Sequence, residues 1–133
     1  MAGPAENKTV ARPPLVFVAE DDPHLLDLAV LILQSEGCDC RAFATGEAAL
    51  TAFRSAAPKP SLIVSDFSMG NNKMTGTQFL AECKKLKPDL KTFLVSGSVD
   101  ELTVREDGRP VDRFLGKPFK AAEFVQIIRE LIR

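Results

Sequence analysis

The sequence has no excess of either charge and no long apolar run. Its 17 lysines and arginines nearly balance its 18 aspartates and glutamates. Because phosphate contacts need clustered basic residues, this balance argues against nucleic acid as a partner. No apolar stretch approaches the roughly 20 residues that span a bilayer, and the N-terminus lacks the charged and apolar segments of a signal peptide. We therefore expect a cytoplasmic protein without a membrane anchor.

Cysteine and histidine are scarce, with three and one residues respectively. Cys38 and Cys40 form a CxC pair on a short predicted strand, a spacing found in metal and redox sites, but no histidine or further cysteine pair accompanies them. We predict that these two cysteines and Cys83 are reduced packing residues. The single histidine, His24, falls in the first turn of a predicted helix, and we expect it on the surface rather than as a phosphohistidine.

The chain length indicates one domain behind a short tail. Residues 1–14 are polar, contain three prolines and show no periodicity, which predicts a flexible N-terminal tail. Residues 15–133 then form a single domain, long enough to bury a core without disulfides or a structural metal. There are no internal repeats beyond the alternation of strands and helices.

Apolar runs of strand length alternate with segments of helical spacing. Strands are predicted at residues 15–19, 38–43, 61–65, 91–95 and 111–116, and helices at 23–36, about 47–55, about 75–86 and around 124–131. A further helix at about 99–106 has a thin apolar stripe and is interrupted at 107–110, so we expect it to be short, mobile or unwound. The alternation predicts an α/β fold, a (βα)5 three-layer sandwich around a five-stranded parallel sheet.

Five polar residues stand at the ends of the predicted strands. Four strands end at such residues: Glu20 and Asp21, Asp66, Ser96 and Lys117. Because the carboxyl ends of parallel strands share one edge of a sheet, these side chains are expected to converge. Carboxylates so close together repel unless a cation lies between them, which predicts a divalent metal. One carboxylate would remain free to react.

Four strings carry a family resemblance: VFVAEDDP, IVSDFSM, FLVSGS and FLGKPF, in this order and at these separations. Together they resemble the signatures of the response-regulator receiver domain of two-component signalling, over about Leu15 to Arg133. The resemblance implies the flavodoxin-like strand order 2-1-3-4-5. It also implies a phosphorelay protein and not an enzyme: the only reactions expected of it are the acceptance of a phosphoryl group and the slow loss of that group.

The resemblance assigns roles to the acidic residues. It makes Asp66 the phosphoacceptor, whose carboxylate attacks phosphorus once the charges of both partners are neutralised. It makes Asp21 a direct ligand of Mg²⁺, with Glu20 binding directly or through water. Asp66 itself and the backbone carbonyl of Ser68 complete the protein ligands, a set of oxygen atoms that suits Mg²⁺.

The resemblance also implies a switch. Lys117 would pair with the acceptor carboxylate at rest and with a phosphoryl oxygen afterwards, and its bond to Pro118 would be cis. The hydroxyl of Ser96 would move toward the new phosphoryl group. Phe114 occupies the position where many receivers have a tyrosine; it can swing between rotamers but has no hydroxyl to hydrogen-bond at either end.

One loop departs from the usual receiver pattern. Receivers commonly have proline after the methionine that matches Met69, and then reach a glycine within few residues. This chain has Gly70–Lys73 as a short insertion before Gly76. Because glycine and asparagine tolerate left-handed backbone, we expect the loop to be mobile and to change access to the site. Similar loops and weak fourth helices occur in some receivers attached to hybrid histidine kinases.

The expected partners are a histidine kinase or a histidine phosphotransfer domain, together with an output partner that the sequence does not identify. The composition is compatible with a monomer or a weak dimer. Two other functions stay open at this point. One is a pseudo-receiver that binds proteins without being phosphorylated. The other is a haloacid-dehalogenase-like phosphatase, although such enzymes use a DxD motif that EDDP does not match and a cap that 133 residues would not hold.

Overall fold

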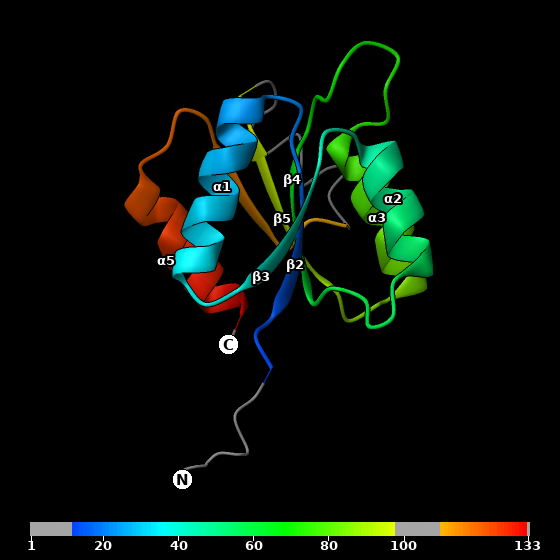
Figure 1. Cartoon of the computed structure of the whole chain (residues 1–133). Coiled ribbons are helices and arrows are strands. Elements are labelled where there is room, and N and C mark those ends of the chain that lie inside the picture. Colours follow the sequence, from blue (N-terminus) through cyan, green and yellow to red (C-terminus); the bar gives the residue numbers. More distant parts are fainter. Residues whose placement is uncertain (1–11, 98–109, 133) are drawn as a thin grey trace, which may run out of the picture.

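A five-stranded parallel sheet forms the centre of the domain (Figure 1). The computed structural model describes residues 12–97 and 110–132. The strands are β2 (Leu15–Ala19), β3 (Asp39–Phe43), β4 (Leu62–Asp66), β5 (Lys91–Ser96) and β6 (Arg113–Gly116). Their spatial order is β3-β2-β4-β5-β6. Counted along the chain this is the order 2-1-3-4-5, as predicted.

Helices cover both faces of the sheet. They are α1 (Pro23–Ser35), α2 (Gly46–Ser55), α3 (Gly76–Leu86) and α5 (Ala121–Leu131). Helices α1 and α5 lie on one face and α2 and α3 on the other (Figure 1), which confirms the three-layer sandwich. The predicted weak helix at about 99–106 falls outside the described residues. None of the helices within residues 12–97 and 110–132 is long and apolar enough to cross a membrane.

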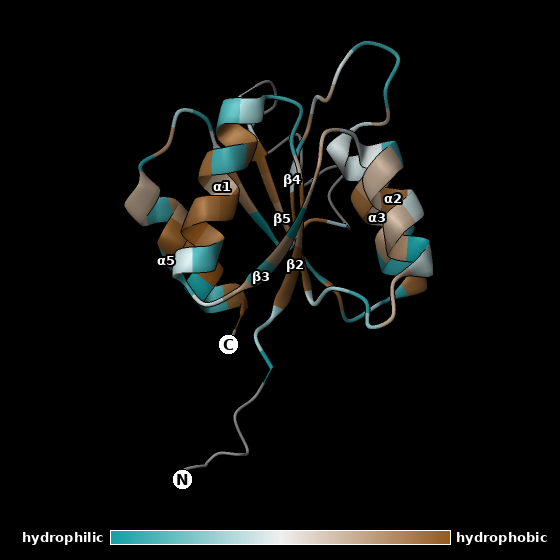
Figure 2. Ribbon diagram, viewed as in Figure 1, coloured by the Kyte–Doolittle hydropathy of each residue, from teal (hydrophilic) through white to brown (hydrophobic). Residues whose placement is uncertain are grey.

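The core is divided by the sheet into two apolar layers. Along β2, Phe17 and Ala19 belong to the layer under α2 and α3, whereas Val16 and Val18 belong to the layer under α1 and α5. All four are at most 1% exposed, and burying each large apolar side chain stabilises the fold by about 1.5–3 kcal/mol. In Figure 2 the central strands carry brown, the colour of hydrophobic residues. A strand buried on both faces explains why LVFVA reads as a continuous apolar run.

The local signals at the ends of α1 act as predicted. Asp22 caps the helix, because its Oδ1 accepts hydrogen bonds from the backbone N–H groups of His24 at 2.9 Å and Leu25 at 3.3 Å. Pro23 is the first helical residue. Gly37 follows the helix with a φ of 87°, a conformation that glycine adopts without steric cost. These residues fix where the chain leaves β2 and where it turns toward β3.

The cysteines lie in packed positions. Cys38 precedes β3 instead of belonging to it, yet it and Cys40 both contact the apolar layer under α1 and α5. Cys83 is fully buried in the opposite layer. All three thiols are free. Burial raises the pKa of Cys40 to about 11 and that of Cys83 to about 12, which keeps both thiols protonated at neutral pH.

A partly buried polar contact fixes the register of the edge strand β6. The backbone N–H of the fully buried Thr92 donates to Asp112 Oδ2 at 2.9 Å, and the Asp112 N–H returns a hydrogen bond to Thr92 Oγ1 at 3.0 Å. Lys84 of α3 adds an ion pair to Asp112 at 3.0 Å. Burial would raise the pKa of Asp112, but Lys84 and Thr92 outweigh it and hold that pKa below its usual value. This register places Gly116 opposite Ser96, and Lys117 follows directly.

Replacing Gly76 with alanine is expected to destabilise the domain. Gly76 begins α3 against the end of β4, and a Cβ there would lie 2.1 Å from the backbone oxygen of Asp66. Overpacking of this kind costs about 1–3 kcal/mol of unfolding free energy or more. Urea denaturation followed by circular dichroism measures the loss. Gly116→Ala is the matched control, because its nearest neighbour would be 3.8 Å away; equal stability of the two variants would contradict the expected clash.

Candidate functional site at the acidic edge of the sheet

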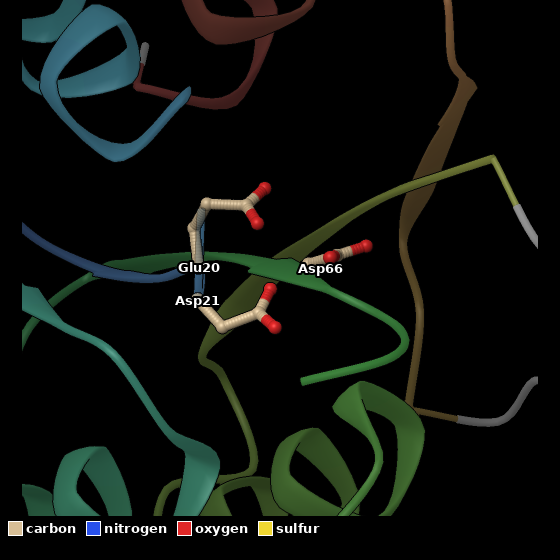
Figure 3. Close-up of side chains that lie close together, drawn as sticks. All are labelled: Glu20, Asp21 and Asp66. Atoms are coloured by element: carbon tan, nitrogen blue, oxygen red, sulfur yellow. The ribbon is translucent and has the colours of Figure 1, made fainter. Parts of the chain in front are cut away.

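Three carboxylates meet where β2 and β4 end. Glu20 and Asp21 follow β2, and Asp66 is the last residue of its neighbour β4. One carboxylate oxygen from each lies within 4.8 Å of those from the other two, and Figure 3 shows the three side chains gathered at this edge. Glu20 is 7% and Asp66 9% exposed, whereas Asp21 is open to solvent. The convergence predicted from the strand ends is therefore present.

A lysine from the far end of the chain enters the same site. Lys117 Nζ donates a hydrogen bond to Glu20 Oε1 at 2.9 Å and lies 3.5 Å from Asp66 Oδ2. The pairing with Asp66 was expected, but the shorter contact is with Glu20. The backbone N–H of Lys117 donates to the carbonyl of Ser96 at 2.9 Å, which continues the β5–β6 ladder. The bond from Lys117 to Pro118 is cis, as the resemblance implies.

The electrostatics of the site are dominated by burial. Burial raises the pKa of Glu20 to about 7, against the opposing hydrogen bond from Lys117. Burial also raises the pKa of Asp66. For Lys117 burial favours the neutral amine, but the hydrogen bond to Glu20 and the charge of Asp66 more than compensate, so its pKa is raised. One ammonium cannot balance three carboxylates, and oxygen ligands so close together suit a hard divalent cation.

The remaining predicted residues take different positions around the cluster. Ser96 is buried, 1% exposed, at the last position of β5. Ser68 lies two residues beyond Asp66 and is exposed. Phe114 is half-buried and packs against the apolar layer under α2 and α3. The switch roles of Ser96 and Phe114 and the metal-ligand role of the Ser68 carbonyl stay predictions.

The loop from β4 to α3, residues 67–75, projects past the edge of the sheet (Figure 1). We refer to it as the acceptor loop. Its base is closed by a hydrogen bond of 2.7 Å from the Gly76 N–H to the Phe67 carbonyl. At its tip, Gly70 and Asn72 have positive φ values of 119° and 59°. Left-handed backbone was expected there, and it allows the chain to reverse within the insertion.

Sequence reasoning missed the residue that ties this loop to α2. Glu47 Oε2 accepts a hydrogen bond of 2.7 Å from the backbone N–H of Met74, a residue 27 positions away. No short-range pattern indicates such a contact. By contrast, the capping box of Thr75 and Gln78 at the start of α3 follows a short-range sequence pattern, a threonine with a glutamine three residues later, that can be recognised without the structure.

Comparison with known proteins identifies the family. Residues 16–129 match the response regulator receiver domain. The chain therefore belongs to the receiver domain family of two-component signal transduction. Receiver domains are phosphoacceptors, not classical enzymes, and they accept phosphoryl groups from histidine kinases.

The relatives differ in their overall architecture. The DNA-binding response regulator MtrA of Mycolicibacterium smegmatis is 29% identical over 123 residues, covering 89% of this chain and 50% of MtrA. The sensor kinase CckA of Brucella abortus is 30% identical over 120 residues, covering 88% of this chain and 12% of CckA. The chain thus spans half or less of these two proteins. Among solved structures, TrrA of Thermotoga maritima in complex with Mg²⁺ and BeF is 25% identical, with a TM-score of 0.76, covering 89% of this chain and 98% of TrrA.

Mg²⁺ is expected to stabilise the domain through the acidic cluster. The wild type should gain about 1–3 kcal/mol of unfolding free energy at Mg²⁺ concentrations well above the dissociation constant. Asp21→Asn should lose most of this gain, and in EDTA it should be at least as stable as wild type because one repelling carboxylate is removed. Thermal melts with and without Mg²⁺ test both points. Asp39→Asn, an exposed carboxylate at the opposite end of the sheet, is the control; an equal Mg²⁺ shift in all three proteins would exclude the cluster as the binding site.

In the presence of a chelator, stability is expected to decline as pH rises. The folded state raises the pKa of Glu20 from 4.5 to about 7, so between these values it retains a proton that the unfolded chain releases. The stabilisation from that proton is complete at pH values below 4.5, the ordinary pKa, and is lost as the pH rises through the folded-state pKa of about 7. Glu20→Gln should flatten this decline. Urea denaturation in EDTA from about pH 4.5 to about pH 7.5 measures it, and identical slopes for the two proteins would contradict the assignment.

Proposed function

We propose that this domain accepts a phosphoryl group on Asp66, in a Mg²⁺-dependent reaction, from the phosphohistidine of a histidine kinase or histidine phosphotransfer domain. The observation that carries the proposal is the nearly buried carboxylate of Asp66, 3.5 Å from Lys117 Nζ and within 4.8 Å of two further carboxylates. Membership of the receiver family supports the same reaction. The modification would change the contacts of the domain with an output partner.

The reaction exchanges one bond to phosphorus for another. An Asp66 carboxylate oxygen forms the new bond to phosphorus, the bond from phosphorus to the imidazole nitrogen of the donor breaks, and that nitrogen takes up a proton. Lys117 offsets the negative charge that otherwise keeps the carboxylate and the phosphoryl group apart. Mg²⁺, held by Asp21, Asp66, Glu20 and the Ser68 carbonyl, would neutralise the phosphoryl oxygens further. The complex of TrrA with Mg²⁺ and BeF supports this role.

The hydrogen bonding of Lys117 provides a response to phosphorylation. At rest its ammonium is shared between Glu20 at 2.9 Å and Asp66 at 3.5 Å. A phosphoryl group on Asp66 adds charge and acceptor oxygens, which draws the ammonium away from Glu20. Ser96, the last residue of the adjacent strand β5, would donate its hydroxyl as well. These contacts would shift an existing equilibrium of the surrounding loops and of Phe114, which is how a local charge reaches a binding surface.

Incubation with acetyl phosphate and Mg²⁺ tests the proposal directly. Intact mass spectrometry should detect one added phosphoryl group on the wild type, and none after Asp66→Asn or in EDTA. Lys117→Ala should slow the uptake about 10²-fold or more, because a preorganised charge that stabilises the transition state is lost. Asp39→Asn is the matched control and should react like wild type.

Two results would overturn the proposal. The first is an adduct that persists in Asp66→Asn, which would place the modification on another residue. The second is a wild type that stays unmodified and also shows no Mg²⁺-dependent binding of beryllium fluoride. That outcome would favour the pseudo-receiver, a protein-binding module that keeps the fold without the reaction.

A further inference from the structure

Helix α1 exposes apolar side chains on its outer side. Every residue between Asp27 and Gln34 is apolar. Leu28 is 45% and Leu31 is 64% exposed, which makes them two of the few large apolar side chains that are strongly exposed in the described part of the chain. In Figure 2, brown covers most of α1. A single exposed leucine needs no explanation, but two leucines that lie one turn apart form a continuous patch.

The neighbouring helix α5 has the amphipathic pattern that α1 lacks. It buries Phe124, Ile127 and Ile128 against the sheet and has Glu123, Gln126 and Glu130 at exposed positions, so its outer side is polar. The outer side of α1 carries leucine where α5 carries glutamate and glutamine. A helix that is apolar on most of its sides is normally covered on more than one of them. The outer side of α1 therefore has the composition of a contact surface.

The charges at the two ends of this patch are opposite. At one end, Asp27 is exposed and has no ion-pair partner in the described part of the chain. At the other end, Arg129 of α5 donates from Nε and Nη2 to Glu36, which follows α1, at 2.7 and 3.3 Å. The Arg129 side chain stays 57% exposed, and its Nη1 can donate to a further acceptor. Leu31 lies between them, about 6 Å along the helix axis from Asp27 and about 7.5 Å from Glu36.

We propose that this patch is where two copies of the chain associate, with their α1 helices antiparallel about a two-fold axis at Leu31. The two Leu31 side chains then pack against each other. Asp27 of each copy faces Arg129 of the partner subunit, because these two charges lie at similar distances on either side of Leu31. Antiparallel helix dipoles add a favourable interaction. One surface supplies both halves of the contact, as a two-fold dimer requires.

The charges of the patch favour a second copy over another kind of partner. Residues 28–33 carry no charge and the two ends have opposite signs, so neither a strongly acidic nor a strongly basic protein is complementary to it. A contact between one pair of helices is small, and small interfaces associate weakly. We therefore expect a dissociation constant of about 10 µM to 1 mM. The inference goes beyond the proposed function and does not depend on phosphorylation of Asp66.

Sedimentation equilibrium of the wild type, from about 5 µM to about 2 mM protein, should show a monomer that becomes a dimer as concentration rises. Leu31→Glu should raise the dissociation constant at least about tenfold, because two carboxylates would face each other at the axis. Leu86→Glu is the matched control and should associate like wild type. Leu86 is 49% exposed and ends α3 on the other side of the sheet. Thermal melts check that each variant is folded.

A charge exchange tests the two-fold arrangement itself. Asp27→Arg and Arg129→Glu should each weaken self-association, because like charges then meet on both sides of the axis. An equimolar mixture of the two variants should associate again, since every pair in the mixed dimer joins opposite charges.

Three results would contradict the inference. A wild type that stays monomeric at every concentration would overturn it and leave the patch to a different protein. A dimer that Leu31→Glu does not weaken would place the interface on another surface. A mixture of the two charge variants that associates no better than either variant alone would exclude the antiparallel two-fold arrangement.

Discussion

One ammonium shared between two nearly buried carboxylates is the contact on which the site depends. Lys117 lies 97 residues after Glu20, and the two meet because β2 and β6 run in the same direction and end at the same edge. Burying carboxylates is costly unless a cation accompanies them. The ammonium of Lys117 offsets part of this cost by pairing with both carboxylates. The third carboxylate, on Asp21, leaves an excess of negative charge. The edge of the sheet is therefore poised for a further cation and for a change in how its lysine is shared.

The rest of the fold keeps this edge in place. Its two apolar layers bind the strands to helices on both faces, so the carboxylates are presented from a rigid support. At the opposite end of β5, Thr92 and Asp112 fix the register of the edge strand β6. This register determines where Lys117, which follows β6, lies relative to the carboxylates. The repelling charges are concentrated at one end of the sheet. Apolar packing in the rest of the domain stabilises the fold enough to offset their repulsion.

Much of this could be predicted from the sequence because it depends on short-range patterns. Apolar runs identified the strands, Asp22, Pro23 and Gly37 marked the ends of α1, and the strand ends identified the acidic cluster. The predicted start of α2, at about residue 47, is one residue late, since Thr45 caps the helix and Gly46 is already helical. The predicted second strand includes Cys38, but β3 begins at the next residue.

What could not be predicted depends on side chains from distant segments. Whether Lys117 lies closer to Glu20 or to Asp66 is decided by a difference of 0.6 Å between contacts of 2.9 and 3.5 Å. The contact of Glu47 with Met74 joins a helix to a loop across 27 residues. Neither has a sequence signature, because each arises only after the sheet and its helices have assembled. Sequence thus indicates which groups converge, and the structure determines how they pair.

A crystal structure with Mg²⁺ and beryllium fluoride would test the role of this edge most directly. We expect the fluoroberyllate on an Asp66 carboxylate oxygen, Mg²⁺ between Asp66 and Asp21, and Lys117 Nζ moved from Glu20 to a fluorine atom. A structure that contains the metal but leaves Asp66 unmodified, or one in which Lys117 keeps its hydrogen bond to Glu20 beside the fluoroberyllate, would contradict this role.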